Sequence, residues 1–385
     1  MSAVQSRTIF EPSHELFRES FRTFLAKEVL PCYSQWEQDG IVDRAIWIKA
    51  GQQGFLGLGV PEEYGGAGTD DFRYNVIIAE ELARQTLSGL VFTMQNDVAL
   101  PYFLHLATEE QKRRWLPGIV SGEKITAIAM TEPQAGSDLA GITTRAVRSA
   151  AGDEYILNGA KTFISNGQLA DLVIVVVRTG EDRHRGLSLI VVEGDTPGFT
   201  RGRRLDKIGM HSQDTSELFF GDACVPAANL LGEENRGFYA LVRNLAQERL
   251  SAAVGAVAGA ESMLTDTLEY VKGRVAFGQP IGRFQNTRFV LAELFTEARV
   301  ARVFIDHCIT EHLSGRLSDD EAAMAKWWTT ELQNRVMDRC LQLHGGYGYM
   351  NEYRVARAWR DSRVLTIAAG STEIMKEIIG RSLGL

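Results

Sequence analysis

The spacing of apolar residues changes twice along this chain of 385 residues, and that change limits the possible folds. In the first part, residues such as Leu16, Phe17 and Phe21 recur at helical spacing. Two β-branched runs of strand length then follow, at 171–177 and 187–192. Helical spacing returns beyond Glu233. We therefore predict three domains: a helical domain over 1–124, a β-domain over 125–235 and a second helical domain over 236–385.

Local signals predict how these parts are built. No helical segment separates the β-branched runs, which favours an antiparallel sheet over a doubly wound one. The dipeptide Asn158-Gly159 lies between two apolar triplets and predicts a hairpin turn. We expect Pro31 to end the first helix. Thr108 opens a capping box, and Pro117 is expected to close the helix that follows.

Overall charge and cysteine usage exclude several classes of protein. The net charge of −8 argues against a nucleic-acid partner or an anionic membrane surface. No apolar segment reaches the roughly 20 residues that a membrane span requires. The N-terminus lacks a signal-peptide pattern, and the four cysteines form no CxxC motif, so we expect a cytoplasmic protein with reduced, buried thiols. The histidines form no HExxH motif, and no metal site is expected.

Glu248 and Arg249 stand out in a segment, about 238–271, that is predicted to be one long helix. The residues one or two turns from Glu248 are uncharged, and most are apolar or small, so both charged side chains should face the interior. Adjacent residues on a helix diverge by about 100°, so the two do not face each other. Either Glu248 has a separate partner in a buried ion pair, or it is a functional carboxylate.

Three further segments allow two interpretations each. The small-residue loop 131–138 follows an apolar strand and is either a plain turn or a place where backbone N–H groups approach a ligand. It lacks GxGxxG and a βαβ unit, which disfavours a Rossmann site. Segments 274–281 and 342–346 are typical of helix ends. The first also carries an Arg and a Phe that could bind a phosphate and stack on a ring.

Taken together and in this order, the segments AMTEPQAGSDLAG, TFISNG, RVAFGQPI, QLHGGYGYM and GSTEIM resemble the acyl-CoA dehydrogenase family over nearly the whole chain. Residues 246–250 and 321–328 look most like the long-chain branch, with the isovaleryl-CoA branch second. The resemblance implies an α+β, mainly α fold with an N-terminal helical domain, a central antiparallel β-domain and a C-terminal four-helix bundle. It also implies a homotetramer built as a dimer of dimers.

The resemblance further implies FAD as cofactor and α,β-dehydrogenation of acyl-CoA thioesters to trans-2-enoyl-CoA. The residues it assigns to FAD are Ile128, Met130, Thr131, Gly136 and Ser137 on one side of the flavin, Phe163, Ile164 and Ser165 on the other, Arg274, Phe277 and Gln285 from a neighbouring subunit, and Gln342, Gly345, Gly346, Ser371 and Glu373.

In this family a carboxylate removes the α-proton of the substrate. Most members carry that Glu in the last loop, at the position that Ala369 occupies here. The long-chain and isovaleryl branches instead place it on the helix, at the position of Glu248. The resemblance therefore implies Glu248 as base, while Ala369 contributes its backbone N–H to the thioester carbonyl.

The resemblance assigns a further set of residues to the acyl-CoA substrate: Ser137, His184, Arg185, Tyr239, Ala246, Gln247, Arg249, Ala368 and Gly370. Small residues at 368 and 369 favour medium, long or branched acyl chains. An electron-transfer flavoprotein is the expected electron acceptor. Three alternatives remain: an acyl group tethered to a carrier protein, a CoA-linked sterol or amino-acid side chain, and a non-catalytic assembly subunit, which Ala369 suggests.

Overall fold

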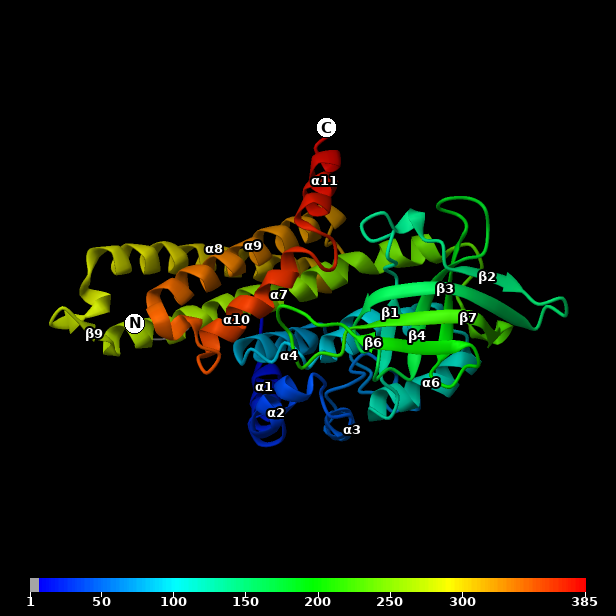
Figure 1. Ribbon diagram of the computed structural model, residues 1–385, viewed down its shortest axis with the longest axis horizontal. Helices are drawn as coiled ribbons and strands as arrows, with labels where there is room; N and C mark the ends of the chain where they lie inside the picture. Colours follow the sequence, from blue (N-terminus) through cyan, green and yellow to red (C-terminus); the bar gives the residue numbers. More distant parts are fainter. Residues whose placement is uncertain (1–6) are drawn as a thin grey trace.

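The computed structural model describes residues 7–385 and places a sheet beside a bundle of long helices, with the N-terminal helices packed along both (Figure 1). The N-terminal helical elements are α1 Pro12–Phe24, η1 Leu25–Val29, α2 Leu30–Asp39, α3 Ala45–Gln52, η2 Glu62–Tyr64, α4 Arg73–Arg84, η3 Met94–Ala99, α5 Leu100–Leu106 and α6 Glu109–Ser121.

Proline does not end helices where we expected. Pro31 lies at the start of α2, directly after the π-helical turn η1, so the helical course continues through it. The wider turn accommodates a residue that has no N–H to donate. Pro117 lies inside α6, which begins with the predicted capping box at Thr108 and ends before Gly122. The carbonyl that loses its helical partner there belongs to Arg113, an exposed residue that water can reach.

The β-domain is an eight-stranded sheet in the order β6-β7-β3-β2-β4-β5-β8, with β1 paired to β4. Its strands are β1 Thr126–Ala129, β2 Arg145–Arg148, β3 Glu154–Ile164, β4 Leu172–Arg178, β5 Leu187–Glu193, β6 Phe199–Arg204, β7 Ser216–Pro226 and β8 Leu230–Leu231. Most neighbours are antiparallel, as predicted, but β1 and β2 both pair with β4 in parallel. Parallel pairing arises here without a connecting helix because strands β2 and β3 make the connection between β1 and β4.

The predicted hairpin turn at Asn158-Gly159 is wrong. Both residues lie inside β3, which shifts its register against β7 between Leu157 and Gly159. A Cβ at Gly159 would come within 2.6 Å of Thr144 Oγ1. The close approach of the segment that carries Thr144 therefore excludes a side chain at this position. The glycine is therefore required by packing and not by a turn.

Strand β4 is buried on both faces, which fixes how the sheet sits in the molecule. Val173, Val175 and Val177 join a core made by the strands themselves. Leu172 and Ile174 point the other way, into a core that they share with α5 and α6. Side chains alternate along a strand, so an unbroken β-branched run suits this two-sided burial.

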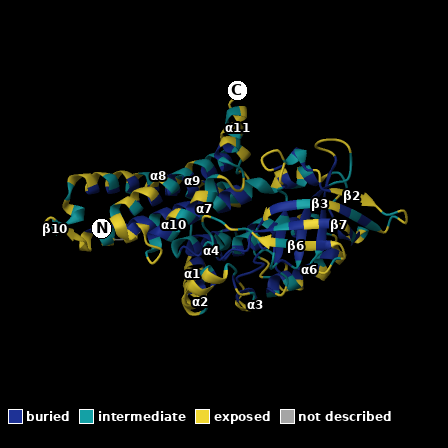
Figure 2. Ribbon diagram, viewed as in Figure 1, coloured by how far each residue is buried: buried dark blue, intermediate teal, exposed yellow. Residues whose placement is uncertain are grey.

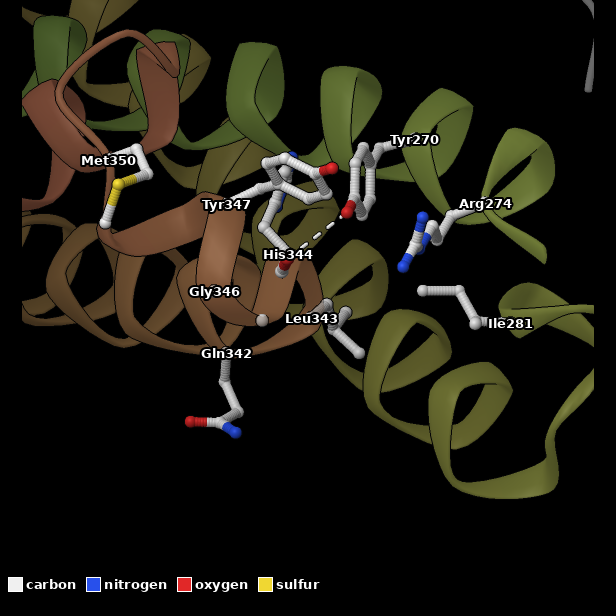
Figure 3. Close-up of a pocket in the computed structure, with 10 residues that line it drawn as sticks. Tyr270, Arg274, Ile281, Gln342, Leu343, His344, Gly346, Tyr347 and Met350 are labelled. Atoms are coloured by element: carbon white, nitrogen blue, oxygen red, sulfur yellow. Dashed lines mark hydrogen bonds between the residues drawn. The ribbon is translucent and has the colours of Figure 1, made fainter. Parts of the chain in front are cut away.

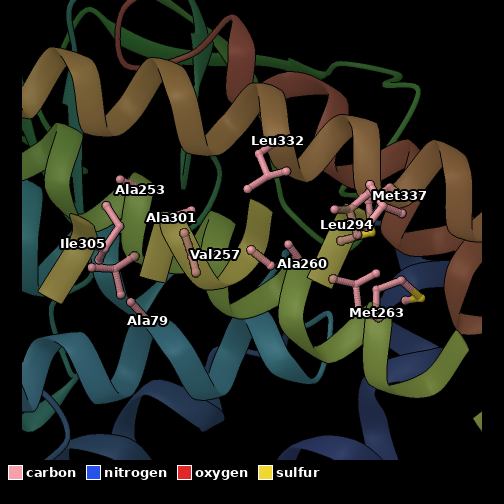
Figure 4. Close-up of a cluster of buried hydrophobic side chains, with 14 of the residues drawn as sticks. Ala79, Ala253, Val257, Ala260, Met263, Leu294, Ala301, Ile305, Leu332 and Met337 are labelled. Carbon is pink, nitrogen blue, oxygen red and sulfur yellow. The ribbon is translucent and has the colours of Figure 1, made fainter. Parts of the chain in front are cut away.

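The C-terminal helices form the bundle: α7 Gly237–Gly273, α8 Gln285–Leu313, α9 Asp319–His344, α10 Arg354–Ser362 and α11 Thr372–Ser382. Short strands β9 Val275–Ala276 and β10 Gln279–Pro280 connect α7 to α8. Figure 4 shows the bundle core, where small residues of α7 such as Ala253 and Ala260 allow close packing against α8, α9 and α4. Helix α7 extends from the sheet to the far end of the bundle and thus joins the two parts (Figure 1).

Burial follows this arrangement: exposed residues run along the outside of α8, whereas buried ones gather where α7, α4 and α10 meet (Figure 2). All four cysteines are free, but the expectation that they are buried is met only by Cys308 and Cys340, because Cys32 is exposed and Cys224 is partly exposed. Over residues 7–385, we find no helix with the length and apolar character needed to cross a bilayer.

Candidate functional site

Glu248 lies on α7 and is only 7% exposed, as the helical pattern predicted. Its Oε1 accepts hydrogen bonds from Tyr102 Oη at 3.0 Å and from Asn244 Nδ2 at 2.9 Å. Both donors are neutral, so the carboxylate is not held in the buried ion pair that was one of the two sequence interpretations. Burial raises the pKa of Glu248 to about 7, against the two hydrogen bonds and the nearby charge of Arg249, which lower it.

Arg249 is also buried, 6% exposed, on an adjoining face of α7. Its Nε is enclosed and makes no hydrogen bond within the part of the chain that the structure describes. Burial lowers the pKa of Arg249, while the charges of Asp319 and Glu248 act in the opposite direction. The guanidinium is thus a buried cation with donors left for a polar ligand.

The last loop, which carries Ala369, is held by Lys326. That lysine is buried on α9 and donates from Nζ to the carbonyl oxygen of Gly370. Burial lowers the Lys326 pKa to about 8, and Arg249 adds to this effect. Ala369 has a φ of 53°, a left-handed conformation that is unusual for alanine and that concentrates at functional sites. Over residues 7–385, no hydrogen bond uses the Ala369 N–H, which is therefore available to a ligand.

The residues on either side of Ala369 differ in exposure and in hydrogen bonding. Ala368 is exposed and Gly370 half-exposed. The hydroxyl of Ser371 accepts from the N–H of Ile374 at 3.4 Å and caps α11, so its oxygen already has a structural partner. Glu373 is exposed in the first turn of the same helix.

The loop that follows β1 is tied to the end of β3. Lys161 Nζ donates to the carbonyl of Met130 at 3.1 Å and to Glu132 Oε1 at 2.8 Å, and the N–H of Thr162 donates to the Thr131 carbonyl at 2.9 Å. The structure therefore brings Met130 and Thr131 beside Phe163. Phe163 is 67% exposed with a φ of 59°, so its ring stands clear of the sheet.

The remaining members of this group differ in exposure. Gly136 and Ser137 are exposed, and Ile128 and Ser165 are half-buried. Ile164, in contrast, is 3% exposed and packs into the core of the sheet. The side chain of Ile164 is therefore enclosed by the sheet and does not face solvent.

Three of the residues assigned to the substrate gather at the start of α7. The N–H groups of His184 and Arg185 both donate to Asp182 Oδ1, which fixes the turn before β5. The His184 ring meets Phe238 edge-on at 5.0 Å. Tyr239 is the main influence that raises the pKa of Arg185. All three face solvent, so they do not belong to an enclosed site.

The other two substrate assignments on α7 are half-buried. Gln247 Nε2 donates to the backbone carbonyl of Asp97 at 2.7 Å, so its amide N–H group serves to join two helices. Ala246 has no polar side-chain atoms, and only its backbone and methyl group can meet a ligand.

A cavity of about 500 Å³ lies at the far end of the bundle (Figure 3). Its lining residues are Tyr270, Arg274, Ile281, Gln342, Leu343, His344, Gly345, Gly346, Tyr347 and Met350. Tyr270 stacks on His344 with ring centroids 4.1 Å apart, and Tyr270 Oη donates to the His344 carbonyl at 3.2 Å. Arg274 reaches over Tyr347, whereas the Gln342 side chain points away from both (Figure 3). Near this end, Phe277 is 95% exposed, and Gln285 is exposed at the start of α8.

Two of the groups of residues assigned to FAD lie at opposite ends of the molecule. Strand β1 belongs to the sheet, whereas β9, which follows Arg274, lies at the far tip of the bundle (Figure 1). One chain therefore cannot bring both groups to the same small molecule.

Each group nonetheless fits part of a flavin dinucleotide. The exposed ring of Phe163 beside the Met130–Thr131 backbone offers a flat apolar surface next to polar backbone groups. At the far end, a Cβ added to Gly345 or Gly346 would meet nothing within 4 Å, so their backbone faces open space. Arg274 supplies a cation beside that space, which suits a phosphate.

Tyr102, Lys326 and Asp97 were missed by sequence reasoning. Tyr102 donates to Glu248, and Lys326 donates to the Gly370 carbonyl in the Ala369 loop. Asp97 is buried on η3, where burial raises its pKa to about 6, and it accepts from Ser251 on α7. The sequence carries no local signal for these contacts, because each joins segments far apart in the chain.

Comparison with known proteins places the chain among similar sequences and structures. Family models for the N-terminal, middle and C-terminal domains of acyl-CoA dehydrogenase match residues 11–123, 127–223 and 235–384. The mitochondrial long-chain specific acyl-CoA dehydrogenase of Mus musculus is 47% identical over 100% of this chain and 89% of its own. The crystal structure of an acyl-CoA dehydrogenase from Geobacillus kaustophilus is 52% identical with a TM-score of 0.96, over 99% of this chain and 100% of that one. An acyl-CoA dehydrogenase from Bacillus anthracis complexed with FAD is 32% identical with a TM-score of 0.90, over 97% of this chain and 68% of that one.

Proposed function

Because this chain belongs to the acyl-CoA dehydrogenase family, we propose that Glu248 is the general base of its reaction. The protein is an oxidoreductase that dehydrogenates acyl-CoA thioesters between Cα and Cβ. One observation carries the assignment: Glu248 is a buried carboxylate with a pKa of about 7, in a chain that has Ala at 369. A base with a pKa near the working pH balances the fraction ionised against proton affinity.

The chain's own residues divide the work. The Glu248 carboxylate takes the α-proton, and the buried surroundings that raise its pKa also keep competing water away. The Ala369 N–H donates to the thioester carbonyl oxygen, where negative charge grows as the proton leaves. Lys326 holds that N–H in place through Gly370. The chemistry that FAD would supply, when bound, is that of an acceptor for the hydride that leaves Cβ.

We assign FAD to two copies of the chain. Met130, Thr131 and Ser137 with Phe163 would hold the flavin, and Arg274 with the Gly345-Gly346 backbone would hold the adenosine diphosphate part bound to a second copy. The separation of these groups within one chain supports an oligomer, and the family resemblance suggests a homotetramer. An electron-transfer flavoprotein is the proposed electron acceptor.

We assign the substrate to the medium- to long-chain or branched class. Ala368 and Ala369 leave room beside the reacting carbons, and the 47% identity to a long-chain enzyme supports the same class. Arg249 would meet a polar part of CoA, and His184, Arg185 and Tyr239 would line the route by which it enters.

The assignment of Glu248 is tested by replacing it with glutamine. Glu248→Gln keeps the shape and the hydrogen-bond acceptor but removes the base, so kcat/KM should fall by about 10²–10⁴-fold while FAD stays bound. Glu269→Gln is the matched control, because Glu269 lies on the same helix but its side chain is 68% exposed. Glu248→Gln activity within about tenfold of the unaltered protein would refute the assignment.

A further inference from the structure

We propose that Tyr102 and Asn244 are positioning residues that hold one oxygen of the Glu248 carboxylate and leave the other oxygen facing the substrate. This inference rests on Glu248 being the base.

The two donors converge on a single atom. Tyr102 Oη and Asn244 Nδ2 both donate to Glu248 Oε1, at 3.0 and 2.9 Å. Within residues 7–385, no donor reaches Oε2. If the hydrogen bonds served only to stabilise a buried carboxylate, a donor on each of its two oxygens would stabilise it more. The asymmetric arrangement instead fixes the plane of the group and keeps one lone-pair face free for a proton.

Asn244 is itself held by the backbone. Its Nδ2 carries two hydrogens, and besides the bond to Glu248 it donates to the carbonyl of Val98 at 3.2 Å. Both amide hydrogens are therefore used, and the side chain cannot turn without breaking one of these bonds. The orientation of the carboxylate is thus tied to segment η3.

Pro101 leaves a second backbone carbonyl of η3, that of Asp97, open to a donor from α7. Proline has no N–H, so the Asp97 carbonyl, four residues earlier, lacks the usual α-helical partner. Gln247 on α7 supplies a donor to that carbonyl at 2.7 Å, and Ser251 bonds to the Asp97 side chain. These contacts hold α5, which begins at Leu100, against α7 and present Tyr102 to Glu248.

The charged and titratable groups around Glu248 suit this role. Tyr102 is 2% exposed, and burial followed by the charge of Glu248 raises its pKa, so it stays a protonated donor. Asp97 accepts from Ser251 and Asn75 and does not bond to Glu248. Arg249 on the same helix contributes a charge but no hydrogen bond. The two neutral donors are thus the direct contacts of the carboxylate.

Tyr102→Phe tests the proposal, because it removes the hydroxyl and leaves the ring in the core. The bond from Tyr102 favours the ionised form of Glu248, so its loss should move the acid limb of the kcat/KM profile to higher pH by about one unit. At a given pH on the acid side, kcat/KM should then fall about tenfold. The isotope effect from deuterium at the substrate α-carbon should rise, because proton removal becomes slower. The infrared band of the protonated Glu248 carboxyl, identified by its absence in Glu248→Gln, should titrate at higher pH.

Tyr64→Phe is the matched control, because Tyr64 is a buried tyrosine that donates to another carboxylate, Glu109. Its pH profile should be unchanged. Asn244→Ala removes the second donor and should shift the profile in the same direction, which keeps the proposal testable if Tyr102→Phe fails to fold. Unshifted profiles in both variants, with Glu248→Gln inactive, would overturn the positioning role alone. An active Glu248→Gln would instead refute the base assignment.

Discussion

Removing the Glu248 charge should stabilise the protein at alkaline pH. Burial raises the pKa of this carboxyl from 4.5 to about 7, so the folded protein binds the proton more tightly than the unfolded chain does. Between these two values the unfolded chain releases its proton first, and stability therefore falls as the pH rises through this window. Glutamine resembles the protonated form and accepts the same bonds from Tyr102 and Asn244, so Glu248→Gln escapes this loss.

The size of the effect follows from the pKa shift. A rise from 4.5 to about 7 corresponds to about 3 kcal/mol of unfolding free energy above pH 7. Unfolding entropy near 60 °C is about 2.1 cal/mol/K per residue. For a chain of 385 residues, the gain should raise Tm by about 4 °C if the chain unfolds as one unit.

Thermal unfolding at two pH values measures this directly. At about pH 8.5, Glu248→Gln should melt about 4 °C above the unaltered protein, and at about pH 5 the difference should shrink to about a quarter of that. Glu269→Gln should show no such pH-dependent difference, because its side chain is largely exposed. An equal difference in Tm at both pH values, or a lower Tm for Glu248→Gln at the higher pH, would refute the claim that the ionised Glu248 carboxylate destabilises the fold.

Two other substitutions test the last loop. Lys326→Met removes the bond to the Gly370 carbonyl while keeping the length of the side chain, so the Ala369 N–H should lose its fixed position. We expect kcat/KM to fall more than tenfold at unchanged FAD content. An unaltered kcat/KM would contradict the role given to Lys326. Ala368→Tyr should fill the space beside the reacting carbons and lower kcat/KM for branched or long acyl-CoAs relative to short straight ones; an unchanged ratio across the panel would show that this position does not set specificity.

Much of the fold could be predicted because it depends on local patterns. The long helix expected at about 238–271 is observed at Gly237–Gly273, and the inward position of Glu248 followed from its uncharged helical neighbours. Errors arose where tertiary packing decides the role of a residue. Gly159 looks like a turn residue, yet it is required by the approach of Thr144, and Pro31 starts a helix because a π-helical turn precedes it.

The site shows the same limit. The inward-facing carboxylate was predictable from one helix, and its role as base was implied by the family resemblance alone. The donors to Glu248 and to Gly370 were only partly predictable. Asn244 lies one turn from Glu248, whereas Tyr102 is 146 residues away. Lys326 contacts a carbonyl 44 residues further along the chain. Such contacts depend on how helices pack against each other and leave no periodic signal in the sequence.

Anaerobic mixing of the FAD-loaded protein with medium- and long-chain acyl-CoAs, followed by flavin absorbance, tests the central claim most directly. The unaltered protein should bleach on addition of its substrate, because removal of the α-proton permits reduction of the flavin. Glu248→Gln should bind the same acyl-CoA and keep its yellow colour. Bleaching of Glu248→Gln at a rate within about tenfold of the unaltered protein would contradict the account.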